Sequence, residues 1–152
     1  MPEIILETEI NAPIATCFDL ARDAGFHLES ARETGETILA GKSSGLFELG
    51  DEVTFEGQHL GVRQKLSAKI TQMDAPHSFT DKMTRGVFTS LCHIHEFETL
   101  QNGQTRMIDR VEWRSPLGIL GKLADKIAVE AHLRRFLLKR CARIKARAEA
   151  MK

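Results

Sequence analysis

The chain has 152 residues, of which 28% are charged, and its 21 lysines and arginines balance its 21 aspartates and glutamates. This balance argues against a protein that binds nucleic acid by neutralising phosphates, so no nucleic-acid partner is expected. The length predicts one domain over residues 1–152, with a core large enough to fold without a metal or a disulfide.

The charge is distributed unevenly along the chain. Residues 1–60 hold 12 acidic and 3 basic side chains, so basic residues dominate the remainder. Three cysteines without a Cys-x-x-Cys pair are typical of a reducing compartment. The first residues lack the pattern of a signal peptide, and no apolar run reaches the ~20 residues that span a bilayer. A cytoplasmic protein without stable membrane insertion is therefore expected, and its oligomeric state is left open.

The N-terminal part predicts a strand followed by two short helices. Residues 4–10 alternate apolar and polar side chains, which is the period of a half-buried strand. Pro13 suits the first turn of a helix because its missing N–H would be unpaired there, and Gly25 favours the end of that helix. A second short helix is expected over residues 26–31.

A series of strands separated by turns follows. Residues 62–73 show the clearest alternation, and the Asn102-Gly103 dipeptide favours a type I′ hairpin turn between the last two strands. Short strands are expected near residues 37–40 and 46–49, and longer ones over 52–60, 62–73, 77–85, 90–100 and 105–114.

Ser115 and Pro116 are typical of a helix start, as its N-cap and first-turn residues. An apolar stripe at helical spacing then predicts one long terminal helix from about Leu117 toward Ala150. Together the elements predict an α+β fold. Its curved antiparallel sheet of about seven strands wraps around the C-terminal helix, with two short helices after the first strand.

The last two strands carry titratable residues on the face that should point into the core. Alternation places His93 and His95 together, and it places Asp109 on the matching face of the next strand, with apolar neighbours on both sides. Such a face is typical of a small-molecule cavity. The candidate cavity-lining, ligand-binding residues are Phe55, His59, Leu66, Ala68, Phe79, Asp81, Met83, His93, His95, Phe97, Asp109, Val111, Trp113, Leu123 and Ile127.

Three interpretations of His93 and His95 remain open. A hydrogen-bond network within the cavity is favoured over a purely structural role and over a metal site with His59 or Asp109 as third ligand. Asp81 and Asp109 should each find a partner, because an unpaired buried carboxylate costs several kcal/mol. A carboxylate that holds His95 in one tautomer would make its imidazole a candidate general base. No metal and no cofactor is expected.

A series of short blocks gives the chain a family resemblance. In order they are GDEVTF at 50–55, HLG at 59–61, FTDKM at 79–83, GVF at 86–88, HIHEF at 93–97, TRMID at 105–109 and PLGILG at 116–121. In these blocks the chain resembles the START-like (SRPBCC) superfamily, which includes the Bet v 1 allergens and polyketide cyclases, and within it a bacterial ligand-binding branch. The resemblance implies a helix-grip fold.

Two function classes follow from these observations. The favoured one is binding or carriage of a hydrophobic small molecule in a cavity between the sheet and the C-terminal helix. The alternative is an enzyme of the cyclase, dehydratase or hydrolase type that uses a His–Asp pair in the same cavity as acid and base. The identity of the ligand is left open.

Overall fold

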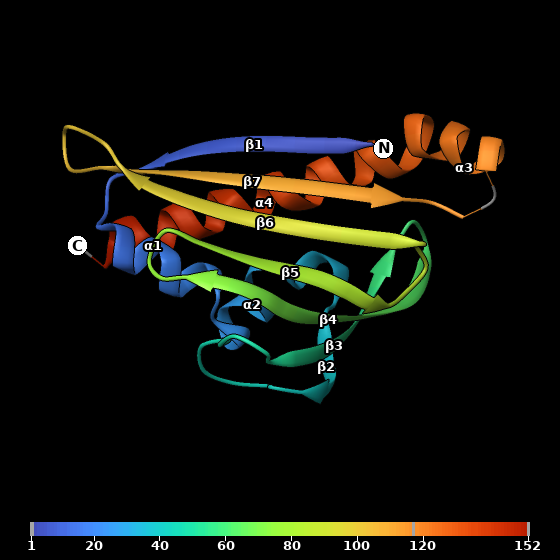
Figure 1. Ribbon diagram of the computed structural model, residues 1–152, viewed down its shortest axis with the longest axis horizontal. Coiled ribbons are helices and arrows are strands. Elements are labelled where there is room, and N and C mark those ends of the chain that lie inside the picture. The colour runs from blue at the N-terminus through green and yellow to red at the C-terminus, as the bar shows by residue number, and fades with distance from the viewer. Residues whose placement is uncertain (1, 117, 152) are drawn as a thin grey trace.

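The structure, a computed structural model, describes residues 2–116 and 118–151. Within these residues seven strands form one antiparallel sheet in the order β1-β7-β6-β5-β4-β3-β2 (Figure 1). The first and last strands are therefore neighbours. The strands are β1 (Glu3–Ile10), β2 (Thr37–Gly41), β3 (Glu52–His59), β4 (Val62–Asp74), β5 (Ser78–Arg85), β6 (Ser90–Thr99) and β7 (Thr105–Arg114).

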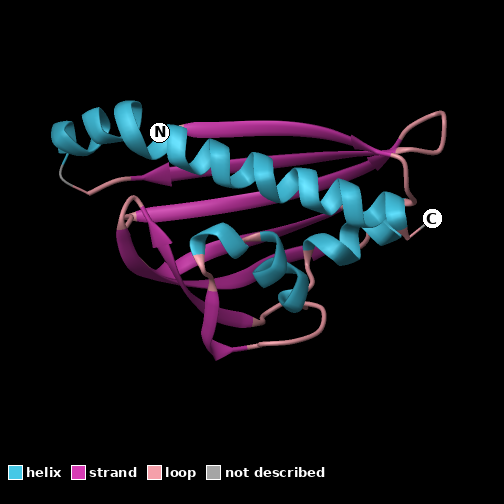
Figure 2. Ribbon diagram, turned by 180° about the vertical axis from the view of Figure 1, so that it is seen from behind, coloured by secondary structure: helices cyan, strands magenta, loops and turns pink. Residues whose placement is uncertain are grey.

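The helices lie on one side of this sheet, and the longest of them runs across its face (Figure 2). They are α1 (Ile14–Ala21), α2 (Ala24–Ser30), the 3-10 turn η1 (Arg32–Thr34), α3 (Gly118–Ala124), the π-helical turn η2 (Asp125–Val129) and α4 (Glu130–Ala150). The predicted α+β architecture, with a curved antiparallel sheet, a long C-terminal helix and short helices after the first strand, is confirmed.

Two predicted elements differ from the structure. The single terminal helix is divided by the π-helical turn into α3 and α4, and its expected start at Leu117 lies outside the described residues. The strand expected over residues 46–49 is absent from the described elements. Phe47 N–H instead donates to the Arg22 carbonyl, and Gly50 N–H donates to the Ile70 carbonyl, so this segment bonds to two separate elements. Leu46 forms only an isolated bridge with Asp23.

Strand β4 carries two irregularities that bend the sheet. The register of β4 against β5 shifts between Ser67 and Ala68 and again between Ile70 and Gln72. Such irregularities bend a strand and increase its twist, so they turn the far part of the sheet towards the helices. A hollow is left between β3, β4 and α4.

Helix α4 packs one apolar stripe against the rest of the protein. Leu137, Cys141, Ile144 and Ala148 are buried, and the helix contacts β1, α1 and α2. These positions follow the three- and four-residue spacing that aligns side chains on one helix face. None of the helices in the described part of the chain is long and apolar enough to cross a membrane.

The uneven charge of the sequence has a structural counterpart at this interface. Arg143 forms an ion pair with Glu33, and Arg147 forms one with Glu29. Arg143 also donates to the Ser30 carbonyl at 2.7 Å. The acidic N-terminal third thus contacts the basic terminal helix, which accounts for part of the charge difference between the two regions.

Ile144 should be one of the most sensitive positions of α4. Its side chain is 0% exposed, whereas that of Leu138 on the same helix is 50% exposed. Ile144→Ala is expected to lower the free energy of unfolding by about 2–5 kcal/mol, because it removes buried carbon and leaves a cavity. Leu138→Ala is the control and should cost less than about 1 kcal/mol. Urea unfolding measures both, and equal losses would contradict this packing.

Candidate ligand-binding site

A cavity of about 260 Å³ lies between the curved sheet, the short helices and α4. Most of the surface of its wall is apolar, and its titratable side chains fall mainly into two groups. This composition is typical of sites that hold small organic molecules. The apolar lining includes Phe47, Val53, Phe55, Leu66, Ala68, Phe79, Phe88, Leu91, Val111, Leu133, Phe136 and Leu137.

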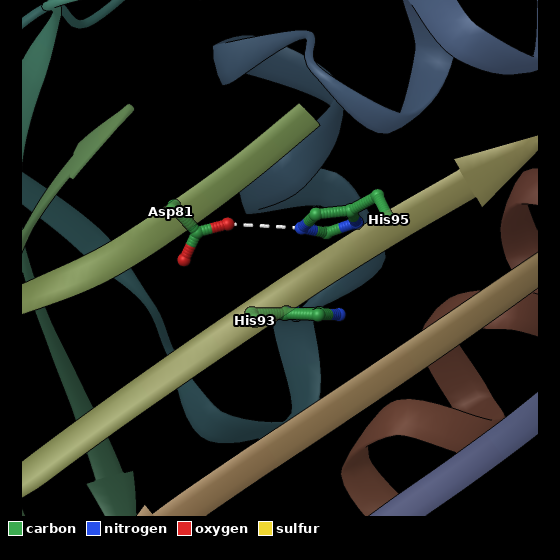
Figure 3. Close-up of side chains that lie close together, drawn as sticks. All are labelled: Asp81, His93 and His95. Atoms are coloured by element: carbon green, nitrogen blue, oxygen red, sulfur yellow. Dashed lines mark hydrogen bonds and ion pairs between the residues drawn. The ribbon is translucent and has the colours of Figure 1, made fainter. Parts of the chain in front are cut away.

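One part of the wall carries a group of titratable side chains, here called the polar cluster: His27, Asp81, His93, His95 and Arg140. They come from α2, β5, β6 and α4, which are distant in sequence. Figure 3 shows Asp81 facing His95 across the neighbouring strands, with His93 next to it on the same strand.

Strand register explains why the acids and histidines meet. Asp81 lies opposite His93 in the β5–β6 pair, and His95 lies opposite Asp109 in the β6–β7 pair. The shortest bonds run along the diagonals of these pairs, which long side chains can span. His95 Nε2 is 2.9 Å from Asp81 Oδ2, and His93 Nε2 is 2.8 Å from Asp109 Oδ1.

Ring stacking holds the histidines in place. The rings of His93 and His95 are stacked with centroids 3.7 Å apart, and Phe79 stacks on the other face of His95 at 4.0 Å. Phe18 meets Phe79 edge to face. The imidazole of His95 is thereby fixed between a buried apolar ring and its neighbouring histidine.

Both ring nitrogens of His95 face carboxylates. Its Nδ1 is 3.4 Å from Asp109 Oδ1, in addition to the bond from Nε2 to Asp81. Only the protonated imidazole can donate from both nitrogens. Although burial opposes it, the hydrogen bonds to Asp109 and Asp81 raise the pKa of His95. His95 is therefore a cation between two anions, and its ring has no free nitrogen with which to act as a base.

Asp81, Asp109, His93 and His95 form one hydrogen-bond network, and the two carboxylates balance the charge of His95. Burial alone would raise the pKa of Asp109, but the hydrogen bonds from His93 and His95 hold it well below its usual range. Asp81 also has a lowered pKa, because the bond from His95 outweighs the effect of burial. Burial and the charge of His95 lower the pKa of His93. His93 is thus neutral, donates from Nε2, and keeps Nδ1 without a partner among the described residues.

Arg140 and His27 complete the cluster. Arg140 is only 4% exposed and donates from Nη2 to the Ala21 carbonyl at 2.8 Å. Its Nε and Nη1 have no hydrogen-bond partner among the described residues, and neither does Nε2 of His27. His27 stacks on Phe55 with centroids 4.3 Å apart. Burial, with the charge of Arg140, lowers the pKa of His27 to about 3, so this ring is neutral.

A second polar group lies elsewhere on the cavity wall. His59 Nδ1 is 2.8 Å from His132 Nε2, and His59 Nε2 is 3.6 Å from Glu36 Oε1. Gly57 makes room for Glu36, because a Cβ at that position would collide with its carboxylate. This group connects β3 to the first turn of α4.

The structure places many of the sequence candidates on the cavity wall. These are Phe55, His59, Leu66, Ala68, Phe79, Asp81, His93, His95 and Val111. Asp109 lies behind the two histidines, fully buried, and contacts them rather than the cavity. Phe97 and Trp113 belong to the core, and Met83 packs over Gly86.

The placement of Leu123 and Ile127 on the cavity wall was wrong. Leu123 is 55% exposed and Ile127 is 68% exposed. The reason is the interruption of the predicted helix by η2: the segment before α4 lies beyond the end of the sheet, as Figure 1 shows for α3. The apolar stripe that faces the cavity is carried by Leu133, Phe136 and Leu137 instead.

Four members of the two polar groups were missed from the sequence: His27, Glu36, His132 and Arg140. Arg140 could have been found from the sequence, because it interrupts the apolar stripe formed by Leu137, Cys141 and Ile144. A basic residue at core spacing in a helix indicates a buried cation. His27 and Glu36 lie in short segments without clear periodicity, and His132 lies in the predicted terminal helix but outside the apolar spacing of Leu137, Cys141 and Ile144.

Within the described part of the chain, the group that could hold a metal ion is Asp81, His93 and His95, whose candidate ligand atoms lie within 4.8 Å of one another. His59, considered as a third ligand from the sequence, contacts His132 and Glu36 instead. Nε2 of each histidine in this trio is already hydrogen-bonded to a carboxylate. A metal would have to replace these hydrogen bonds, so the arrangement favours a proton-sharing network.

The architecture matches solved structures along nearly its whole length. A protein from Thermus thermophilus has 16% identity over 99% of both chains, with a TM-score of 0.79. A START superfamily protein from Mycobacterium smegmatis has 14% identity over 99% of both chains, with a TM-score of 0.73. The Zhui aromatase/cyclase from Streptomyces has 12% identity over 97% of this chain and 93% of its own, with a TM-score of 0.77.

These likenesses establish the fold: the chain has the START-like helix-grip architecture, as its sequence motifs predicted. No protein-family model and no curated protein matches the sequence. The function must therefore be argued from the site itself.

Asp109 should be the residue on which the polar network depends most. Asp109→Asn keeps the shape but removes the charge that faces both histidines, and it is expected to lower the free energy of unfolding by about 3–5 kcal/mol. The pKa of His95 should fall at the same time, which NMR titration measures. Glu98→Gln is the control, because Glu98 pairs with Arg106 at the surface and should contribute less than about 1 kcal/mol. If Asp109→Asn and Glu98→Gln lower the free energy of unfolding equally, the stabilising role of Asp109 is refuted.

His27 should make stability depend on pH. Its pKa is about 3 in the folded protein against 6.5 ordinarily, so between these values the unfolded chain binds a proton that the folded one does not. Stability from this group is therefore present above pH 6.5 and is lost as the pH falls towards 3. His27→Phe should reduce the slope of unfolding free energy against pH by at most about 1.4 kcal/mol per pH unit. If unfolding free energy changes with pH by the same amount in the wild-type protein and in His27→Phe, this role of His27 is contradicted.

Proposed function

We propose that the protein binds or carries a hydrophobic small molecule in the cavity between its sheet and α4. The observation that carries this proposal is the form of the cavity: a mostly apolar wall around about 260 Å³, with buried polar atoms of Arg140 and His27 that have no hydrogen-bond partner among the described residues. A well-packed core leaves few voids larger than a water molecule and few buried polar groups unpaired. A bound ligand would fill the cavity and would pair with the buried polar atoms, so it accounts for both features.

The phenylalanines of the wall support an apolar ligand. Phe55, Phe79, Phe88 and Phe136 line the cavity from the sheet, the β5–β6 connection and α4. Each aromatic ring presents a large apolar face at little cost in conformational entropy. The START superfamily protein and the aromatase/cyclase have the same architecture, which fits a cavity used for organic ligands.

The three cysteines of the chain are all free. Free thiols persist in reducing compartments, so we propose that the protein acts in the cytoplasm.

Binding can be measured with N-phenylnaphthylamine, a neutral apolar dye whose fluorescence increases in apolar surroundings. The native protein should bind it, and Ala68→Trp should weaken binding by about tenfold or more, because Ala68 is buried in the cavity wall and an indole there fills the space. Ala142→Trp introduces the same side chain on the exposed face of α4 and should leave binding unchanged. Equal binding by all three proteins would show that the dye lies elsewhere.

A second candidate function is acid–base catalysis by His93, as in an enzyme of the cyclase, dehydratase or hydrolase type. Asp109 accepts from Nε2 of His93, and the pKa of the ring is lowered, so a neutral imidazole with a free Nδ1 lines the cavity. This is the arrangement of an oriented general base. Mass spectrometry of a molecule retained through purification separates the two functions. An unchanged ligand supports the carrier, and conversion that is lost in His93→Gln supports the enzyme.

A further inference from the structure

The least compensated group in the cavity wall is the guanidinium of Arg140. It is 4% exposed, and its one hydrogen bond goes from Nη2 to the Ala21 carbonyl at 2.8 Å. No described carboxylate forms an ion pair with it, and its Nε and Nη1 are buried without partners. A buried charge of this kind is strongly disfavoured unless something else pairs with it.

The geometry of the guanidinium leaves one complete pair of donors free. Nη2 shares one edge of the planar group with Nε and the other edge with Nη1. The Ala21 carbonyl uses one hydrogen of Nη2 and therefore occupies only one of these edges. Because Nε and Nη1 are both unpartnered, the other edge keeps two parallel N–H groups. Two parallel donors on arginine match the two oxygens of a carboxylate.

Nearby cations do not compete for an incoming anion. His95 is already held between Asp81 and Asp109, and His93 donates to Asp109. Arg140 is thus the one cation of the polar cluster without a carboxylate of its own among the described residues.

We propose that the ligand is an apolar monocarboxylic acid whose carboxylate binds the free edge of Arg140, an inference that rests on the function proposed above. The apolar body would then lie against the phenylalanines of the wall. His27, which also lines the cavity with an unpartnered Nε2, would contact the same end of the ligand.

The surrounding charges favour a single negative charge over a phosphate or a dicarboxylate. The Asp81 carboxylate lines the same cavity as Arg140, and its pKa is lowered because the hydrogen bond from His95 outweighs its burial. A doubly charged head group would meet one free cation and a neighbouring carboxylate, and repulsion from Asp81 would oppose it. A neutral alcohol, in turn, would use the same donors without neutralising the guanidinium.

The test compares naphthoate with naphthalenemethanol, which has the same ring system and a neutral head group, as competitors of bound N-phenylnaphthylamine at neutral pH. Wild-type protein should bind naphthoate about tenfold or more tightly than the alcohol, the difference expected for charge-assisted bonds from arginine. Arg140→Met should abolish this preference and leave binding of the alcohol within about threefold.

Arg143→Met is the matched control. Arg143 lies on the same helix but bonds to Ser30 and Glu33 outside the cavity, so the preference should persist. Arg140→Lys keeps the charge without the two-donor edge and should retain only part of the preference. If Arg140→Met does not fold, Arg140→Lys serves as the test variant, and its weakened preference for naphthoate is the expected result.

The outcomes separate the two proposals. Dye binding without a preference for naphthoate in wild-type protein overturns the monocarboxylate, as does a preference that survives Arg140→Met, while the hydrophobic carrier stands. Absence of binding for the dye and for both competitors overturns the carrier and the monocarboxylate together.

Discussion

Charge pairing on the inner face of β5, β6 and β7 is the constraint on which the site depends. Asp81 and Asp109 are carboxylates at positions where a plain core would have apolar residues. They are tolerated because His95 donates to both and His93 donates to the second. Removal of His95 would leave the Asp81 carboxylate without its hydrogen-bond partner, which is far more costly than the exchange of one apolar residue for another. Strand register is therefore tied to this network.

The same network shapes the cavity. Its four side chains bond mainly to one another along the sheet, and α4 adds one contact, from the Cys141 thiol to Asp109 Oδ2 at 3.3 Å. Helix α4 reaches the sheet at its far end, where Ile144 and Ala148 are buried and the helix contacts β1. Nearer its start, Leu133, Phe136 and Leu137 face the cavity. The register shifts of β4 bend the sheet around the helix at this level, and the space enclosed between them is the cavity.

Arg140 differs from every other charged group of the cluster. The histidines and aspartates are balanced within the protein, whereas the guanidinium is fixed by one carbonyl and keeps free donors. A protein selected only for stability would replace such a residue by an apolar one of similar volume, at no loss or with a gain. Its presence on the buried face of α4 fits a role in ligand binding, where the missing partner is supplied by another molecule.

The sequence by itself was sufficient for the local elements and for the polar face. Alternation in residues 90–100 and 105–114 placed His93, His95 and Asp109 on the inner side of two strands, because the strand period of two depends only on backbone geometry. Asn102-Gly103 marked the connection between them. The resemblance to START-like proteins implied a helix-grip fold, which the structure and its matches confirm.

Tertiary structure decided the rest, because it depends on contacts between segments distant in sequence. The diagonal bonds from Asp81 to His95 and from Asp109 to His93 follow from register, which periodicity alone does not determine. The π-helical turn divides α3 from α4 and the segment before α4 lies beyond the end of the sheet (Figure 1), so Leu123 and Ile127 are exposed although their spacing fitted one continuous stripe. Arg140 and His27, on helices far apart in the sequence, meet at one cavity only after the sheet has curved around α4.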